Sequence, residues 1–400
     1  MKGTTTQTPP IQSRRELLRQ GLATGTLLSL GGRVLGANDR LRLALIGYGS
    51  RGTFLAAKTL LAPNTELVAV CDVFQERLEA STTLVPRADK VRDHRRLLDR
   101  KDIDAVIVAT PDHWHASMTI DSCNAGKDVY VEKPLSRTIE EGQAMVLAAR
   151  RNKRIVQVGL QHRSAEHFQR AREIVQSGRL GRIGVLRCRF NKHTSIDRPA
   201  GGHCPAGLDW RAFLGPAPLR EYDQRRHYEW RYFWDYSGGM MTDDGTHVID
   251  MAHFLLDLTA PEEIFQAGGI HVCQDGRETP DTIEVTYRYP NCLVTFEHLS
   301  YTARDLNVEA VGPGGSIKID RTFFEVKPDL NKEIGEKGST DDIDRKHMAN
   351  FVDCVRSRKT PNCDVEVGHR ATTSAILANV SLKLGKKIGW NGTTETHREV

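Results

Sequence analysis

A lysine between an apolar run and a proline is the first residue of this sequence whose position suggests chemistry. Lys133 follows residues 128–131, which we predict to be a buried strand, and it precedes Pro134. Partial burial and a nearby positive charge lower the pKa of a lysine, so Lys133 is a candidate to exchange a proton with a substrate hydroxyl. The plainer interpretation of Lys133 alone is a strand-end lysine with a solvated ammonium.

An aspartate and a histidine form the second candidate group. Asp243 and His247 stand four residues apart, just before residues 248–256, whose apolar spacing predicts a helix. On a helix they share a face, where the carboxylate can orient the imidazole and raise its basicity. The plainer interpretations are an N-cap for Asp243 and a buried structural histidine for His247. We interpret Asp250 and His253 as structural, and we predict no metal site because no third ligand is apparent.

Oxidation of an alcohol at these side chains would also require an electron acceptor. A glycine-rich turn in the sequence predicts a binding site for one. A β-rich run at residues 41–46 leads into Gly47-x-Gly49-x-x-Gly52, and a helical segment follows at residues 53–61. Gly47 permits a tight turn, Gly49 lets the backbone approach a pyrophosphate, and Gly52 allows close packing of helix on sheet. The helix N-terminus adds amides and a positive dipole, so the pattern predicts a dinucleotide site.

An acidic residue at the end of the next strand indicates which dinucleotide. Asp72 ends the predicted strand at residues 66–71 and lies twenty residues after Gly52, where a carboxylate binds the hydroxyls of the adenosine ribose. Asp72 would repel a ribose phosphate, so we predict NAD, with NADP less favoured because Arg77 is near. The predicted cofactor-binding residues are Gly47, Tyr48, Gly49, Ser50, Arg51, Gly52, Asp72, Thr110, Pro111, His115, Glu132 and Lys133.

Alternating elements position these residues. We predict further helices and strands in strict alternation: helix 91–98, strand 105–110, helix 113–125, strand 128–131, helix 138–151 and strand 155–158. Such repetition implies a doubly wound parallel sheet, whose ligands bind beyond the carboxyl ends of the strands.

An aromatic-rich stretch follows between Trp210 and Tyr236. Sugar rings stack on aromatic faces while charged side chains bind their hydroxyls, although core packing is the commoner role of any single aromatic. We name Arg163, Trp234, Tyr236 and His247 as the substrate-binding candidates.

The composition excludes several other classes of protein. The formal net charge is +5, and residues 1–37 carry +4 of it, so the remainder is nearly neutral and predicts neither a nucleic-acid partner nor an anionic membrane surface. The eight cysteines are scattered without a C-x-x-C pair, which predicts neither structural zinc nor a disulfide framework, although one or two disulfides remain open.

The N-terminus resembles an export signal. Arg14 and Arg15 precede a weakly apolar stretch at residues 21–30 that is too short to span a bilayer. We interpret residues 1–37 as a twin-arginine-type signal peptide that sends a folded protein to the periplasm. The alternatives are a disordered basic tail and, because residues 35–37 match a cleavage site poorly, an uncut signal.

Three motifs in order resemble those of the Gfo/Idh/MocA family, named for glucose-fructose oxidoreductase and inositol dehydrogenase. They are Gly47-x-Gly49-x-x-Gly52, Glu132-Lys133-Pro134, and Gly238-Gly239 followed by Asp243-x-x-x-His247. The similarity runs over about residues 38–390 and includes Trp230-Arg231-Tyr232-Phe233-Trp234-Asp235-Tyr236, which resembles the exported bacterial branch in particular.

The resemblance implies both domains and roles. An α/β fold is expected, with a Rossmann domain at residues 38–162. We expect residues 163–340 to form an α+β domain for substrate binding and oligomerisation, with a large, mostly antiparallel open sheet. We expect residues 341–390 to form helices that pack back on the first domain. The resemblance places Lys133 and His247 beside the reacting carbinol, and it implies a homodimer or homotetramer. Strand-like runs for the second sheet lie at residues 263–272, 282–289, 293–301, 307–311 and 316–319.

Three functions remain open at this point. The leading one is an NAD-dependent oxidoreductase acting on a secondary alcohol of a sugar, glycoside or cyclitol, with Lys133 and His247 as the acid–base pair. The second is a redox-neutral NAD-dependent glycoside hydrolase that oxidises C3, eliminates, hydrates and reduces. Export favours the second and predicts tightly bound cofactor, because no NAD pool outside the cytoplasm recycles it. The third is a non-catalytic sugar- or NAD-sensing protein, which the intact acid–base residues argue against.

Overall fold

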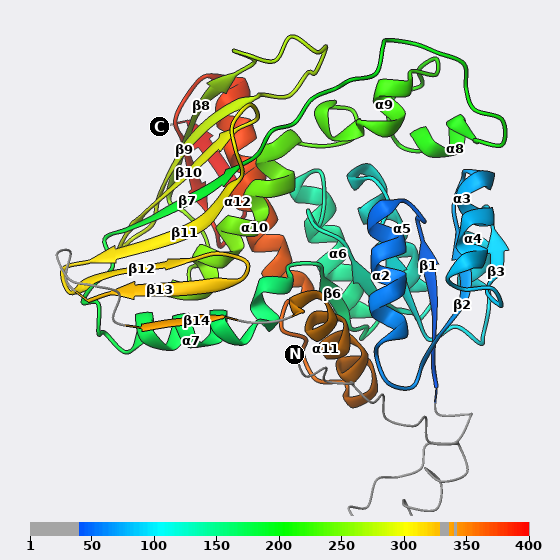
Figure 1. The fold of residues 1–400 in the computed structure, drawn as a ribbon, viewed down its shortest axis with the longest axis horizontal. Helices are drawn as coiled ribbons and strands as arrows, with labels where there is room; N and C mark the ends of the chain where they lie inside the picture. Colours follow the sequence, from blue (N-terminus) through cyan, green and yellow to red (C-terminus); the bar gives the residue numbers. More distant parts are fainter. Residues whose placement is uncertain (1–39, 329–335, 340–341, 400) are drawn as a thin grey trace, which may run out of the picture. The chain divides into compact units, whose positions relative to one another are not determined.

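Six parallel strands form the first sheet, in the order β3-β2-β1-β4-β5-β6 (Figure 1). The computed structural model describes residues 40–328, 336–339 and 342–399, so the predicted signal at residues 1–37 lies outside the described residues. β1 and β5 are buried on almost every residue, as parallel strands covered on both faces are. The strands are β1 (Leu41–Ile46), β2 (Thr65–Cys71), β3 (Asp89–Val91), β4 (Ala105–Val108), β5 (Asp128–Val131) and β6 (Val156–Val158).

The strand order reverses between β1 and β4, and this switch point is where such sheets bind ligands. The predicted doubly wound parallel sheet is therefore confirmed. The helices of this half are α2 (Ser50–Leu60), α3 (Gln75–Ala80), α4 (Arg95–Leu98), α5 (His115–Asn124) and α6 (Ile139–Arg151).

One predicted helix of this half is wrong at its start. Residues 91–98 were expected to be helical, but Val91 ends β3 and pairs with Cys71 of β2. The helix α4 begins only at Arg95, because the Asp93 carboxylate accepts the Arg95 backbone N–H at 3.0 Å and forms a local turn.

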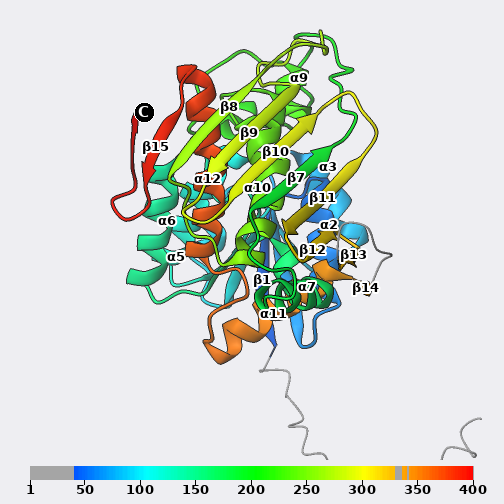
Figure 2. The same cartoon turned by 90° about the vertical axis from the view of Figure 1, so that its left-hand side faces the viewer.

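Ten strands form the second sheet, in the order β14-β13-β12-β11-β7-β10-β9-β8-β15-β16, and only the pairing of β7 with β10 is parallel. The predicted large, mostly antiparallel sheet is confirmed, and Figure 2 shows it face-on. The strands are β7 (Val185–Asn191), β8 (Glu263–Gly269), β9 (Thr282–Arg288), β10 (Leu293–Leu299), β11 (Asp305–Gly312), β12 (Gly315–Ile319), β13 (Phe323–Lys327), β14 (Glu336–Ser339), β15 (Ile388–Asn391) and β16 (Thr396–Glu399).

Two long helices connect this sheet to the first half. α10 (Gly239–Leu256) packs on β7, β10 and β11, and its residues are buried except Leu256. α12 (Val365–Leu384) packs on α10 and β8 and also on α6 and β6, so it contacts both halves. α11 (Ile343–Ser357) packs against α2. The remaining helices are α7 (Glu166–Gln176), α8 (Trp210–Leu214) and α9 (Gln224–Tyr228).

All eight cysteines are free, and six of them are buried. Within the described ranges, no group of three or more His, Cys, Asp or Glu side chains could hold a metal ion. None of the helices in those ranges is both long and apolar enough to cross a bilayer.

Candidate active site

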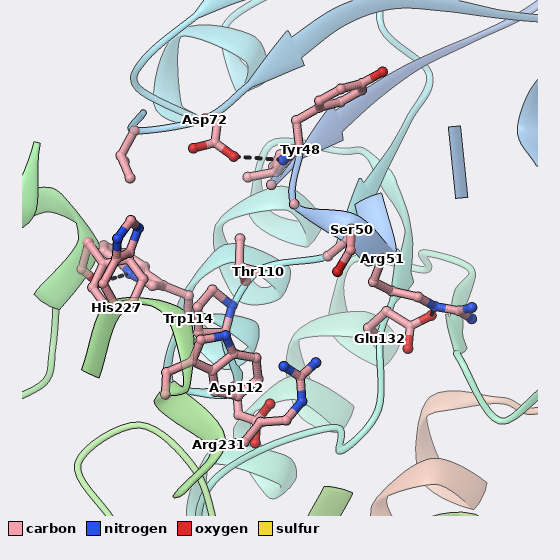
Figure 3. Close-up of a pocket in the computed structure, with 18 of the residues that line it drawn as sticks. Tyr48, Ser50, Arg51, Asp72, Thr110, Asp112, Trp114, Glu132, His227 and Arg231 are labelled. Atoms are coloured by element: carbon pink, nitrogen blue, oxygen red, sulfur yellow. Dashed lines mark hydrogen bonds and ion pairs between the residues drawn. The ribbon is translucent and has the colours of Figure 1, made fainter. Parts of the chain in front are cut away.

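A cleft of about 1440 Å³ lies at the carboxyl ends of β1, β2, β4 and β5. Its walls also include segments of the second half, around residues 227–232 and the start of α10. This volume exceeds what a small ligand alone occupies, so the cleft has room for a dinucleotide and a second molecule. Figure 3 shows the side chains of both halves converging on it.

The glycine turn after β1 has the tight geometry that the sequence predicts. Gly47 has φ +92°, and a Cβ there would lie 2.6 Å from the Ala109 carbonyl oxygen. A Cβ on Gly52 would lie 1.9 Å from the Gly47 carbonyl oxygen, so both positions require glycine. A Cβ on Gly49 would approach nothing closer than Arg77, at 3.8 Å, so packing within the protein does not explain this glycine.

The N-terminus of α2 is free to bind an anion. Its N-cap is Gly49, and no side chain caps the helix. The first amides of a helix lack intrahelical partners, and here they face the cleft beside Tyr48, Ser50 and Arg51. The buried Thr110 Oγ1, at the other wall, has no hydrogen-bond partner among the described residues. These features fit the pyrophosphate of a dinucleotide.

Asp72 is held in place at the end of β2. Its carboxylate accepts the backbone N–H of Tyr48 at 2.7 Å (Figure 3). It also accepts the backbone N–H of Phe74 at 2.9 Å. Burial raises the pKa of Asp72, and Arg77, at 3.9 Å, together with these amides opposes the shift. A fixed carboxylate at this point of the cleft fits the two hydroxyls of an adenosine ribose.

Arg51 and Glu132 form a network with Asp344 of the helix α11. Arg51 Nε donates to Glu132 Oε1 at 2.8 Å, and its Nη2 donates to Asp344 Oδ1 at 3.1 Å. Gln161 donates to the same Asp344 oxygen at 2.9 Å, and Arg321 binds the other one. Asp344 therefore links the glycine turn to the second half of the chain.

Lys133, the residue directly after Glu132, forms a largely buried ion pair with Asp243 in the same cleft. Lys133 Nζ donates to the Asp243 backbone oxygen at 3.0 Å and to its carboxylate, and Arg231 Nε lies 3.3 Å from the second carboxylate oxygen. Burial alone would raise the pKa of Asp243, but Lys133, Arg231 and Lys192 together hold it well below its usual range. Asp243 is therefore a permanent anion between cations.

This pairing corrects the prediction that the Asp243 carboxylate orients His247. The two residues do lie one helical turn apart on α10, but His247 Nδ1 has no hydrogen-bond partner among the described residues. The physical reason is that the Lys133 ammonium and the Arg231 guanidinium attract the carboxylate more strongly than a neutral imidazole does.

His247 is a neutral, buried imidazole that lines the cleft. Burial, followed by the charges of Lys133 and Arg321 and by His162, lowers the pKa of His247 well below its usual value, and Asp243 opposes the shift only in part. His162 packs edge-on against it, with ring centroids 5.2 Å apart. His247 can therefore accept or donate a hydrogen bond without carrying charge.

Two further buried carboxyls line the cleft, and the sequence analysis did not name either. Asp112 accepts the Ser237 hydroxyl at 2.7 Å, and burial raises its pKa to about 6. Asp244 lies 2.6 Å from Lys192 Nζ, and burial, reinforced by Asp243, raises its pKa to about 6. The position of Asp244 beside Asp243 was the only sequence signal for it.

Two predicted substrate residues, Arg163 and Tyr236, do not line the cleft. Arg163 lies outside the cleft, and its guanidinium is 2.8 Å from the buried Asp250 carboxylate. Its positive charge is therefore paired within the protein. Tyr236 is fully buried and packs against His113, with ring centroids 5.1 Å apart, rather than facing the cleft.

Two more predicted residues also lie outside the cleft. Trp234 packs under Lys383 Nζ, which is 4.1 Å from its ring centroid. His115, predicted to bind cofactor, is buried, with its ring nitrogens 2.7 Å from the Pro134 oxygen and 3.0 Å from the Thr110 oxygen. Other aromatic residues line the cleft instead, namely Tyr48, Trp114, Phe213, Tyr228, Trp230 and Tyr232.

Comparison with known proteins agrees with this architecture. Residues 41–160 match the oxidoreductase family described by an NAD-binding Rossmann fold, and residues 184–399 match its C-terminal alpha/beta domain. The chain belongs to the Gfo/Idh/MocA oxidoreductase family, and its first half is an NAD-binding Rossmann domain.

Individual relatives are distant. The chain is 25% identical to myo-inositol 2-dehydrogenase of Thermotoga maritima over 360 residues, which cover 86% of this chain and 96% of the relative. It is 33% identical to a glycosyl hydrolase family 109 protein of a Shewanella strain, over 125 residues that cover 29% of this chain and 27% of that protein. A levoglucosan dehydrogenase structure with NADH and L-sorbose superposes with a TM-score of 0.72 at 20% identity, over 88% of this chain and 98% of that one.

Proposed function

We propose that this NAD-dependent oxidoreductase acts on a secondary alcohol of a sugar, glycoside or cyclitol. The observation that carries the proposal is the buried Lys133–Asp243 pair, which shares one cleft with the dinucleotide turn and with neutral His247. The similarity to an inositol dehydrogenase over most of both chains supports the substrate class.

Bound NAD supplies a hydride acceptor, and the residues of the chain supply the proton transfer. An ammonium has three donor positions, and the Asp243 backbone oxygen and carboxylate bind two of those on Lys133. The third is left for a substrate hydroxyl. As an amine, Lys133 takes the hydroxyl proton during oxidation, and as an ammonium it returns a proton during reduction. Neutral His247 completes the acid–base pair by hydrogen-bonding the same hydroxyl.

A redox-neutral glycoside hydrolase is the second candidate. The specific observation in its favour is the match to a glycosyl hydrolase family 109 protein over 125 residues. The same acid–base residues would serve it, because its cycle begins and ends with transfer of hydride and a hydroxyl proton.

The experiment that separates these functions mixes the purified protein, without added cofactor and then with NAD⁺, with 4-nitrophenyl glycosides, free sugars and myo-inositol. Absorbance of NADH and release of nitrophenolate are followed together. Net NADH is the expected result and identifies a dehydrogenase. Nitrophenolate release without NADH would replace it with the hydrolase, and neither signal with any substrate, despite NAD binding, would favour a sensing role.

We also propose that residues 1–37 direct export to the periplasm, on the basis of Arg14 and Arg15. A fusion of the full chain to a reporter, with both arginines or with lysines in their place, tests this. Periplasmic signal that depends on the arginine pair is expected, and equal signal from both fusions would contradict it.

A homodimer or homotetramer that pairs through the outer face of the second sheet is a separate proposal. That face exposes Phe265 on β8 and Leu293 on β10. Burial of exposed apolar side chains is the usual source of stability in such contacts. Light scattering is expected to give twice or four times the chain mass, and a monomer would contradict the proposal.

A further inference from the structure

Two lysine–carboxylate pairs face the same cleft. Asp243 and Asp244 are consecutive residues of α10, yet each pairs with a lysine from a different half of the chain. Lys133, which follows β5, binds Asp243, and Lys192, the residue directly after β7, lies 2.6 Å from Asp244. All four side chains line the cleft. Oxidation of an alcohol moves one hydroxyl proton, so one such pair is enough for it.

We propose that Asp244, held by Lys192, removes and returns the proton on the substrate carbon next to the oxidised carbon. This gives the enzyme a second activity, hydrogen exchange at that carbon. The inference rests on the proposed function, because a C–H bond becomes acidic only beside a carbonyl.

Oxidation first converts the carbinol to a ketone, with NAD⁺ as the oxidant. The Asp244 carboxylate then takes the proton from the neighbouring carbon, and the C–H electron pair forms a carbon–carbon double bond. The carbonyl π electrons move to oxygen, where the Lys133 ammonium balances the charge. Return of a proton from Asp244 restores the ketone, now with hydrogen from solvent, and reduction restores the alcohol.

The environment of Asp244 suits a base, whereas that of Asp243 does not. Asp243 lies between Lys133 and Arg231, which keep its pKa low and make it a poor proton acceptor. Asp244 is 4% exposed, and the one ion pair it forms within the described residues is with Lys192. Burial and Asp243 raise the pKa of Asp244 to about 6 against the opposing charges of Lys192 and Lys133. Neighbouring carboxyls with separated pKa values commonly have separate roles.

The test uses the full-length protein with NAD⁺ in D₂O, and the probes are glucose, myo-inositol and 4-nitrophenyl β-D-glucoside. NMR of the recovered sugar measures deuterium at each carbon, and absorbance in single-turnover runs measures NADH. Wild-type protein is expected to place deuterium next to the oxidised carbon. Asp244→Asn should lower the ratio of deuterium uptake to NADH formed by at least about 100-fold.

A second variant separates catalysis from structure. Lys192→Met removes a positive charge beside Asp244, so the midpoint of the exchange rate, which increases as Asp244 ionises, should move to higher pH. Lys387→Met removes a lysine of a surface ion pair with Glu263 and should leave both ratio and midpoint unchanged.

The outcomes are distinct. NADH formation without deuterium uptake in the wild type, or undiminished uptake in Asp244→Asn, would overturn the inference and leave the proposed function standing. Absence of NADH and of oxidised product with every probe would refute the proposed function, and the inference with it.

Discussion

Lys133 and Asp243 come from different halves of the chain and meet in one buried ion pair. Lys133 lies two residues beyond β5 of the parallel sheet, and Asp243 lies near the start of α10 on the antiparallel sheet. The pair therefore forms only when both halves are in place. The pair lines the same cleft as the glycine turn, so the proposed proton transfer would occur beside the proposed dinucleotide site.

The two glycines of the turn should respond differently to alanine. In Gly52→Ala the Cβ would lie 1.9 Å from the Gly47 oxygen, so the turn must open, and we expect Tm to fall and NAD binding to be lost. In Gly49→Ala the Cβ meets only Arg77, at 3.8 Å, so Tm should be preserved while NAD binding weakens. Calorimetry and titration of NADH fluorescence measure both effects. Unchanged NADH affinity in Gly49→Ala would show that the backbone there does not approach the cofactor.

Stability should decrease as pH falls from 7.5 to 5.5. Burial lowers the pKa of His113 and His347 to about 4 and that of His253 to about 3, so these side chains are neutral when folded. Unfolded histidines bind protons near pH 6.5, so the unfolded state gains protons that the folded state does not. Each contributes about 1 kcal/mol of lost stability at pH 5.5.

The raised pKa values of Asp112 and Asp244, about 6, act in the opposite direction, because the folded state binds those protons first. Among the described residues, eight histidines with lowered pKa values outnumber these two carboxyls; they are His113, His162, His167, His227, His247, His253, His298 and His347. Chemical unfolding at both pH values measures the balance. A higher free energy of unfolding at pH 5.5 would contradict this account.

Substitution of Arg163 should mainly lower stability, whereas substitution of Arg231 should mainly lower activity. Arg163→Met leaves the buried Asp250 without its partner, so the free energy of unfolding should fall by about 3–5 kcal/mol while KM stays near its original value. Arg231→Met removes a cation from the cleft wall beside Asp243, so kcat/KM should fall while Tm changes less. Kinetics and thermal unfolding of both variants decide this, and a large KM increase in Arg163→Met would restore Arg163 as a substrate residue.

The link from the glycine turn to α11 should control cofactor retention. Asp344→Asn weakens the hydrogen bonds from Arg51, Gln161 and Arg321, so Arg51 at the dinucleotide turn is held mainly by Glu132. We expect NADH to dissociate about 10-fold faster, as charge-assisted hydrogen bonds contribute 1.5–3 kcal/mol, roughly, when intact. Stopped-flow fluorescence measures the rate. Asp353→Asn, at an exposed position of the same helix, should match the wild type.

The first sheet and its glycine turn could be predicted because their signals are local. Each signal can be recognised within a short stretch of sequence: the buried apolar strands, the spacing of Gly47, Gly49 and Gly52, and the acidic residue after β2. β7 was missed although its residues alternate between buried and exposed, because its outward positions are Arg187 and Arg189 and charged residues weaken a strand signal. Without β7, nothing placed Lys192 in the cleft.

Two of the site predictions, those for Asp243 with His247 and for Arg163, depended on a charge that comes from a distant part of the chain. Residue spacing shows which side chains share a helix face, as it did for Asp243 and His247, but it cannot show which charge arrives from another part of the chain. Lys133 and Asp243 are 110 residues apart in the sequence, and Arg163 and Asp250, which also form an ion pair, are 87 residues apart. Only the fold brings these partners together, so the sequence marked Lys133 and Asp243 as candidates without showing that they pair.

The most direct test of the account is the rate of NADH formation in Lys133→Met, measured in a single turnover with saturating NAD⁺ and the substrate found for the wild type. The Lys387→Met protein is the matched control, and NAD binding is measured separately in each. We predict that Lys133→Met binds NAD normally but forms NADH at least about 100-fold more slowly than the wild type. A rate close to that of the wild type would show that Lys133 does not move the proton, and it would contradict the assignment of this site.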